Sequence, residues 1–129
     1  MMQKKVISTP NAPKAIGPYS QAIEANGLLF VSGQIPLDPA TGKIVEGGIE
    51  AQTEQVMNNL GAILTAAGCT FDNIVKTTCL LADMKYFADM NGVYARYFQA
   101  SPPARASFAV KELPLQVLVE IEAVAVVNK

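Results

Sequence analysis

Apolar residues alternate or recur at helical spacing in eight short stretches of the chain. The Asn26-Gly27 pair separates the apolar runs 21–25 and 28–32. This arrangement predicts a β-hairpin, because a type I′ turn needs two consecutive positive φ angles. From residue 49 the spacing becomes helical, and Gly68 follows at the position of a helix C-cap. The apolar face of this helix consists of Ile49, Val56, Leu60, Ile63, Leu64 and Ala67.

Shorter runs predict the remaining elements. Runs of β-branched or small apolar residues predict four more strands, over residues 4–8, 73–82, 104–110 and 117–127. Asp83 can cap a second helix, which Ser101-Pro102-Pro103 ends. The apolar stripe of that helix is Phe87, Met90, Tyr94 and Tyr97. Proline and glycine predict surface loops over residues 9–20 and 35–48.

The element order β-ββ-α-β-α-ββ predicts one α+β domain over residues 1–129, with both helices on one sheet face. The strands at 28–32 and 117–127 are apolar on both faces, although two helices can cover only one of them. The uncovered apolar face predicts a homo-oligomer. If strands 104–110 and 117–127 pair, Arg105 lies one strand away from Glu120.

Composition narrows the functional classes. Half of the 129 residues are hydrophobic and 16% are charged, which indicates a folded protein rather than a disordered segment. The net charge of −1 gives no basic excess, so we expect no nucleic-acid partner. The absence of histidine excludes Ser-His-Asp catalysis and histidine-ligated metal sites. Cys69 and Cys79 form no CxxC motif, so we expect no metal site. No apolar run is long enough to span a membrane, so we expect a cytoplasmic protein.

Glu120 and Arg105 are the strongest candidates for chemistry. Glu120 lies in the middle of an apolar strand, where burial would raise its pKa towards a useful acid–base value. The alternative is a solvated carboxylate on the same face as Glu122. Arg105 is one of two arginines, and its guanidinium fork suits a carboxylate or phosphate. Its alternative role is an internal salt bridge, for which Glu120 is one possible partner.

Four further positions can contribute to a site. Tyr19 lies in the first proline-rich loop, where it can contact a ligand or anchor the loop by packing. Ser32-Gly33 ends a strand, so its backbone can approach a ligand or simply form a turn. Asn91 can present an amide to a pocket or mark a helix irregularity. Ser107 is a poor nucleophile without a histidine, so we interpret it as a hydrogen-bond partner.

The segments at these positions resemble the YjgF/Rid family of reactive-intermediate deaminases, earlier named L-PSP endoribonucleases or translation inhibitors. They are AIGPYSQAI, FVSGQIPLDPATG, AAGCTFDNIVKTTCLLAD, NGVYARYF, PPARASFAV and VEIEAVAV, in family order across almost the whole chain. The resemblance implies a chorismate-mutase-like α+β fold with a six-stranded mixed sheet. It also implies a homotrimer with ligand clefts between subunits.

The implied activity is hydrolysis of 2-iminobutanoate and 2-iminopropanoate to 2-keto acids and ammonia, without a cofactor. The family's carboxylate-binding arginine matches Arg105 and its acidic residue matches Glu120. The implied substrate contacts include Tyr19, Ser32, Gly33, Asn91, Phe87 and Ser107, the last of which replaces a cysteine found in many members. Two alternatives are a small-carboxylate-binding or chaperone-like trimer without turnover, and an endoribonuclease or translation inhibitor.

Overall fold

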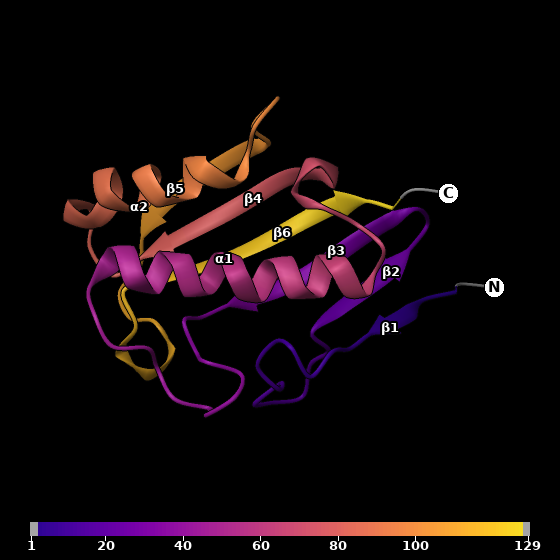
Figure 1. Ribbon diagram of the computed structural model, residues 1–129, viewed down its shortest axis with the longest axis horizontal. Coiled ribbons are helices and arrows are strands. Elements are labelled where there is room, and N and C mark those ends of the chain that lie inside the picture. The colour runs from indigo at the N-terminus through magenta and orange to yellow at the C-terminus, as the bar shows by residue number, and fades with distance from the viewer. Residues whose placement is uncertain (1–2, 128–129) are drawn as a thin grey trace.

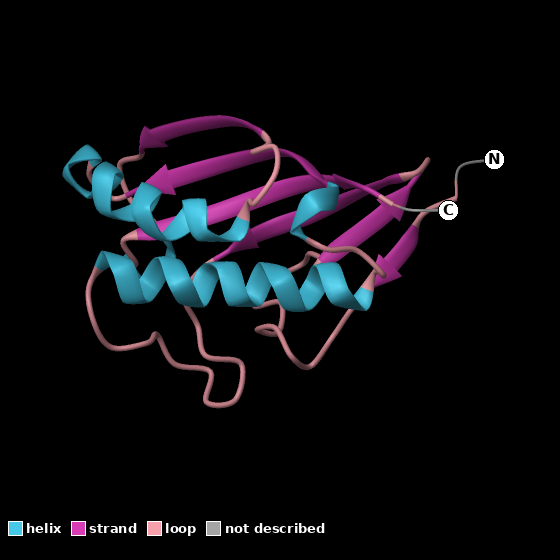
Figure 2. Ribbon diagram, turned by 45° about the horizontal axis from the view of Figure 1, so that its top comes forward, coloured by secondary structure: helices cyan, strands magenta, loops and turns pink. Residues whose placement is uncertain are grey.

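The computed structural model describes residues 3–127 as a six-stranded sheet with helices packed on one face (Figures 1 and 2). The strand order is β1-β2-β3-β6-β4-β5, and the β4–β5 pair is parallel whereas the other neighbours are antiparallel. The strands are β1 (Lys5–Ile7), β2 (Ala22–Ala25), β3 (Leu28–Gln34), β4 (Ile74–Leu81), β5 (Ala104–Ala109) and β6 (Val119–Val126). The helices are α1 (Ile49–Ala66) and α2 (Phe87–Tyr94).

The predicted element order and hairpin are confirmed. Asn26 and Gly27 have φ angles of 55° and 78°, the two positive values that a type I′ turn requires. The second helix is shorter than its stripe suggests, because Tyr97 lies in a 3₁₀ turn after α2. Asp83 caps the 3₁₀ turn Met84–Tyr86 that leads into α2, accepting a hydrogen bond from the Lys85 N–H at 2.8 Å.

Strands 104–110 and 117–127, whose pairing would place Arg105 one strand from Glu120, do not pair, because β4 lies between β5 and β6. Helix α2 serves as the crossover that brings β5 back parallel to β4, with Thr77 opposite Arg105. Strand β6 then enters the centre of the sheet between β3 and β4. Arg105 and Glu120 are therefore two strands apart.

The two faces of the sheet differ in what covers them. Helix α1 buries Val56, Met57, Leu60, Ile63 and Leu64. These residues share one core with the alternate residues Val119, Ile121, Ala123 and Ala125 of β6. On the opposite, open face, Phe30, Phe108 and Val126 are each exposed to 44–48%. No helix within residues 3–127 has the length and apolar character needed to cross a bilayer.

Candidate functional site

The residues singled out from the sequence fall into two clusters on opposite faces of the sheet. Side chains alternate along a strand, so the strand neighbour of each residue identifies its face. Arg105 lies beside Thr77, which is buried beneath the helices and hydrogen-bonds to Tyr94 of α2. Glu120 lies beside Leu80 of β4. Leu80 is three residues beyond Thr77, so its side chain and that of Glu120 point to the opposite, open face of the sheet. An internal salt bridge between Arg105 and Glu120 is therefore excluded.

The arginine cluster comprises Arg105 with Phe87, Asn91 and Tyr94 of α2. The Arg105 Nη1 atom donates a hydrogen bond of 2.7 Å to Asn91 Oδ1. The guanidinium carbon lies 4.9 Å from the ring centroid of Tyr94 and 5.5 Å from that of Phe87. An amide and two aromatic rings orient this guanidinium without neutralising its charge, which leaves it able to bind an anion.

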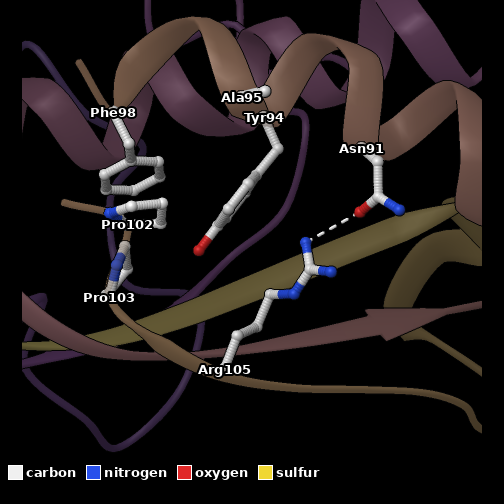
Figure 3. A pocket seen from close by; sticks show the side chains of 7 residues that line it. All are labelled: Asn91, Tyr94, Ala95, Phe98, Pro102, Pro103 and Arg105. Atoms are coloured by element: carbon white, nitrogen blue, oxygen red, sulfur yellow. Dashed lines mark hydrogen bonds between the residues drawn. The ribbon is translucent and has the colours of Figure 1, made fainter. Parts of the chain in front are cut away.

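A pocket of about 490 Å³ opens beside the arginine cluster (Figure 3). Arg105 and Asn91 form its polar end, and the Tyr94 ring reaches into it from α2. The other lining residues are Ala95, Phe98, Pro102 and Pro103. A cationic fork at the end of an otherwise largely apolar pocket suits a small organic carboxylate.

Ser107 lies two residues beyond Arg105 on β5, beside Cys79 of β4. Its hydroxyl oxygen is buried and has no well-formed hydrogen bond within residues 3–127. Burial raises the pKa of the Cys79 thiol, and this outweighs the lowering by the Arg105 charge and by the Ser107 hydroxyl. The thiol is therefore neutral at ordinary pH. A ligand can contact the Ser107 hydroxyl only if the surrounding side chains shift.

The second cluster, the glutamate cluster, is built on a β-bulge and comprises Tyr19, Ser32, Gly33 and Glu120. The pairing of β3 with β6 shifts between Val31 and Gln34, so Ser32 and Gly33 together oppose one residue of β6. The extra residue turns Gly33 towards Glu120 on the open face. A Cβ atom at position 33 would lie 2.9 Å from Glu120 Cδ and 3.2 Å from Cγ. Glycine therefore provides the space that the Glu120 side chain occupies.

Hydrogen bonds from both sides hold the bulge in place. The Ser32 hydroxyl donates to the Ser20 carbonyl at 2.6 Å, and the Gln34 amide donates to the Ser32 carbonyl at 3.0 Å. Gln21, which is also buried, donates to the carbonyls of Thr9, Ala12 and Pro13 and so fixes the loop that carries Tyr19. The hydroxyl of Ser32 thus has a structural partner, as do its backbone N–H, which donates to the Gln21 carbonyl, and its backbone carbonyl.

The glutamate cluster lines a cleft of about 390 Å³. Its walls include Ile16, Ile35, Pro114 and Glu122 as well as the four residues of the cluster. Burial raises the pKa of Glu120, and the neighbouring Glu122 raises it further. A carboxyl with a raised pKa in a cleft is suited to accepting and returning a proton.

Tyr94, which its spacing predicts only as part of an apolar stripe, also contacts Arg105. The signal was present in the spacing, since Phe87, Asn91 and Tyr94 stand at i, i+4 and i+7 on one helix face. It could be interpreted only once β5 was known to lie below that face. The roles of Gln21, which fixes the first proline-rich loop, and of Gln34, which supports the bulge of β3, gave no sequence signal. Neither spacing nor composition distinguishes a buried glutamine from an exposed one.

Comparison with known proteins identifies the family to which this chain belongs. The profile described as Endoribonuclease L-PSP matches residues 9–127. The chain belongs to this family, also known as YjgF/Rid. A RutC family protein of Pyrococcus horikoshii is 57% identical over 95% of this chain and 97% of its own length. The 2-iminobutanoate/2-iminopropanoate deaminase of Mus musculus is 54% identical over 95% of this chain and 91% of its own.

Solved structures of family members share the fold. A Rid-family protein of Yersinia pestis is 52% identical, with a TM-score of 0.94 over 97% of this chain and 100% of its own. The structure of Escherichia coli TdcF with bound serine is 41% identical, with a TM-score of 0.92 over 96% of this chain and 99% of its own. The α+β fold with a mixed six-stranded sheet, expected from the resemblance, is confirmed.

Proposed function

We propose that this Rid-family protein is a 2-iminobutanoate/2-iminopropanoate deaminase, which hydrolyses small 2-imino acids to 2-keto acids and ammonia. The observation that carries the proposal is the pair of complementary clusters. One presents at a pocket a guanidinium that has no carboxylate partner within residues 3–127, and the other presents a carboxyl of raised pKa at a cleft. The name of the mouse relative, 54% identical to this chain, supports the same activity.

A complete site then requires two copies of the chain. Arg105 and Glu120 face opposite sides of the same sheet, so one copy cannot direct both groups at a small substrate. In a homotrimer with a repeated head-to-tail contact, the arginine cluster of one subunit can meet the glutamate cluster of the next. The exposed apolar residues of the open face, such as Phe30 and Phe108, favour such an assembly.

In the proposed mechanism, Arg105 binds the substrate carboxylate through its guanidinium fork, and Asn91 fixes the orientation of that fork. Glu120, in its ionised form, accepts a proton from a water molecule as the water oxygen attacks the imine carbon. Protonated Glu120 then returns a proton to the nitrogen. In the resulting carbinolamine, Glu120 accepts the hydroxyl proton and passes it to the nitrogen, so the carbon–nitrogen bond breaks, ammonia leaves and the carbonyl of the 2-keto acid forms.

The direct test is hydrolysis of an imine generated in the assay. A dehydratase acting on threonine releases 2-iminobutanoate, and the added protein should accelerate its loss above the rate of spontaneous hydrolysis. Glu120→Gln should bind 2-ketobutyrate as the wild type does but lose most of the acceleration. A protein that binds 2-ketobutyrate without accelerating hydrolysis is a carboxylate-binding protein, and the proposed deaminase activity is then wrong.

A further inference from the structure

Arg105 is oriented by side chains that carry no negative charge. An arginine on an edge strand is commonly fixed by a carboxylate, which would compete with a carboxylate ligand for the same fork. The Cys79 thiol, which is neutral, also interacts with Arg105. The partners that α2 supplies to Arg105 are Asn91 and the rings of Phe87 and Tyr94. Phe87, Asn91 and Tyr94 lie on one face of α2, so a single helix face orients the guanidinium of Arg105.

Tyr94 differs from the other two because it is itself fixed to the sheet. Its hydroxyl shares a 2.7 Å hydrogen bond with Thr77 Oγ1. Thr77 is fully buried, and it is the residue of β4 directly beside Arg105 in the parallel register. Tyr94 is 6% exposed, and burial raises the pKa of its phenol, so the hydroxyl stays protonated at neutral pH. The ring therefore spans from α2 to β4 and passes 4.9 Å from the guanidinium carbon.

We infer that Thr77 and Tyr94 form a positioning pair, which holds the Arg105 fork towards its pocket for binding a substrate carboxylate. The inference rests on the proposed role of Arg105 as the carboxylate clamp. The hydrogen bond to Thr77 fixes the ring, and the ring holds the cation without neutralising it. Figure 3 shows the Tyr94 ring and the Arg105 side chain converging on one cavity, with the Asn91 hydrogen bond on the other side of the guanidinium.

The pair should act on carboxylate affinity and leave the proton transfer at Glu120 unchanged. The probe is 2-ketobutyrate, whose Kd is measured by calorimetry, together with KM and kcat for 2-iminobutanoate. Tyr94→Leu removes the ring and should weaken both Kd and KM about tenfold, with kcat within about twofold of the wild type. Tyr94→Phe and Thr77→Val each remove one end of the hydrogen bond and should weaken Kd about two- to fivefold. The double variant should be no weaker than either single variant, since both remove the same bond.

Tyr97 is the matched control, because it lies one helical turn along and packs on Phe71 with ring centroids 5.1 Å apart rather than on the guanidinium. Tyr97→Leu should lower thermal stability and leave Kd unchanged. Equal weakening by Tyr94→Leu and Tyr97→Leu, or additive effects of Tyr94→Phe and Thr77→Val, would overturn the inference. If Tyr94→Leu does not fold, the two conservative variants decide the question. A wild type that binds no 2-keto acid overturns the proposed function itself, whereas normal binding in all variants overturns only the positioning pair.

Discussion

Replacing Gly33 by alanine tests whether the place of the Glu120 carboxyl group determines the rate. The new Cβ atom would lie 2.9 Å from Glu120 Cδ, and ordinary van der Waals contact begins at 3.4 Å. Glu120 Cδ must therefore retreat by at least half an ångström, the difference between those two distances, and the carboxylate oxygen nearest to the Cβ must move further. A misplacement of about 1 Å in a reacting group can lower a rate about 100-fold, so we expect a loss of that size in kcat.

The same substitution should leave the fold intact. The backbone of Gly33 is outside the positive-φ region, so alanine introduces no strain there. The atoms that must move belong to the end of a flexible side chain. Alanine also reduces the conformational freedom of the unfolded chain, which offsets part of the cost, and the free energy of unfolding should change by less than about 1 kcal/mol.

Gly92→Ala is the matched control for this experiment. Gly92 is exposed in α2, and a Cβ atom there meets nothing within 4 Å. The control should keep wild-type turnover and gain about 0.5–1 kcal/mol of stability, as is usual for glycine to alanine in a helix. Turnover is measured with 2-iminobutanoate generated in the assay, and unfolding with urea. Wild-type turnover in a folded Gly33→Ala variant would refute the proposed role of Glu120.

Arg105→Lys keeps the charge but loses the fork and should lower kcat/KM at least about 10-fold, whereas Arg96→Lys, which changes the chain's other arginine in the same way, should leave kcat/KM unchanged. Because Glu120 acts as a base when ionised, kcat/KM should fall as the pH drops through the raised pKa of Glu120. Glu122→Gln removes the charge that raises this pKa, so in a pH–rate profile the acidic limb should move to lower pH. A carboxyl whose pKa is raised on folding stabilises the fold below its unfolded pKa, and this stability is lost as the pH rises through the folded pKa. Glu120→Gln should therefore resist urea better than the wild type at pH 7, and equal resistance would count against burial of the charge.

The local parts of the fold could be predicted from the sequence because short-range chemistry determines them. The Asn26-Gly27 turn and the period of α1 depend on neighbouring residues, and both have the predicted form. The place of β6 between β3 and β4 depends on contacts between distant segments, which no local pattern records. For this reason the sequence left open whether β5 and β6 pair, and the structure shows that β4 separates them.

The candidate site was predictable as a set of residues but not as an arrangement. Arg105 and Glu120 stood out because a charged group in an apolar strand is unusual. That they lie on opposite faces follows from the register of β5 and β6 with β4, which became known only from the structure. The bulge at Ser32-Gly33 reverses the facing of Gly33, and a period-two pattern cannot reveal such an inserted residue.

Mixing two impaired variants tests most directly whether the site lies between subunits. Arg105→Lys subunits keep the glutamate cluster, and Glu120→Gln subunits keep the arginine cluster. In an equal mixture reassembled from unfolded chains, about one quarter of the head-to-tail contacts in a random ring should join two intact clusters. The mixture should therefore recover about a quarter of wild-type turnover per site, well above either parent. A mixture that forms hybrid trimers but is no more active than its parents would contradict a site shared between subunits.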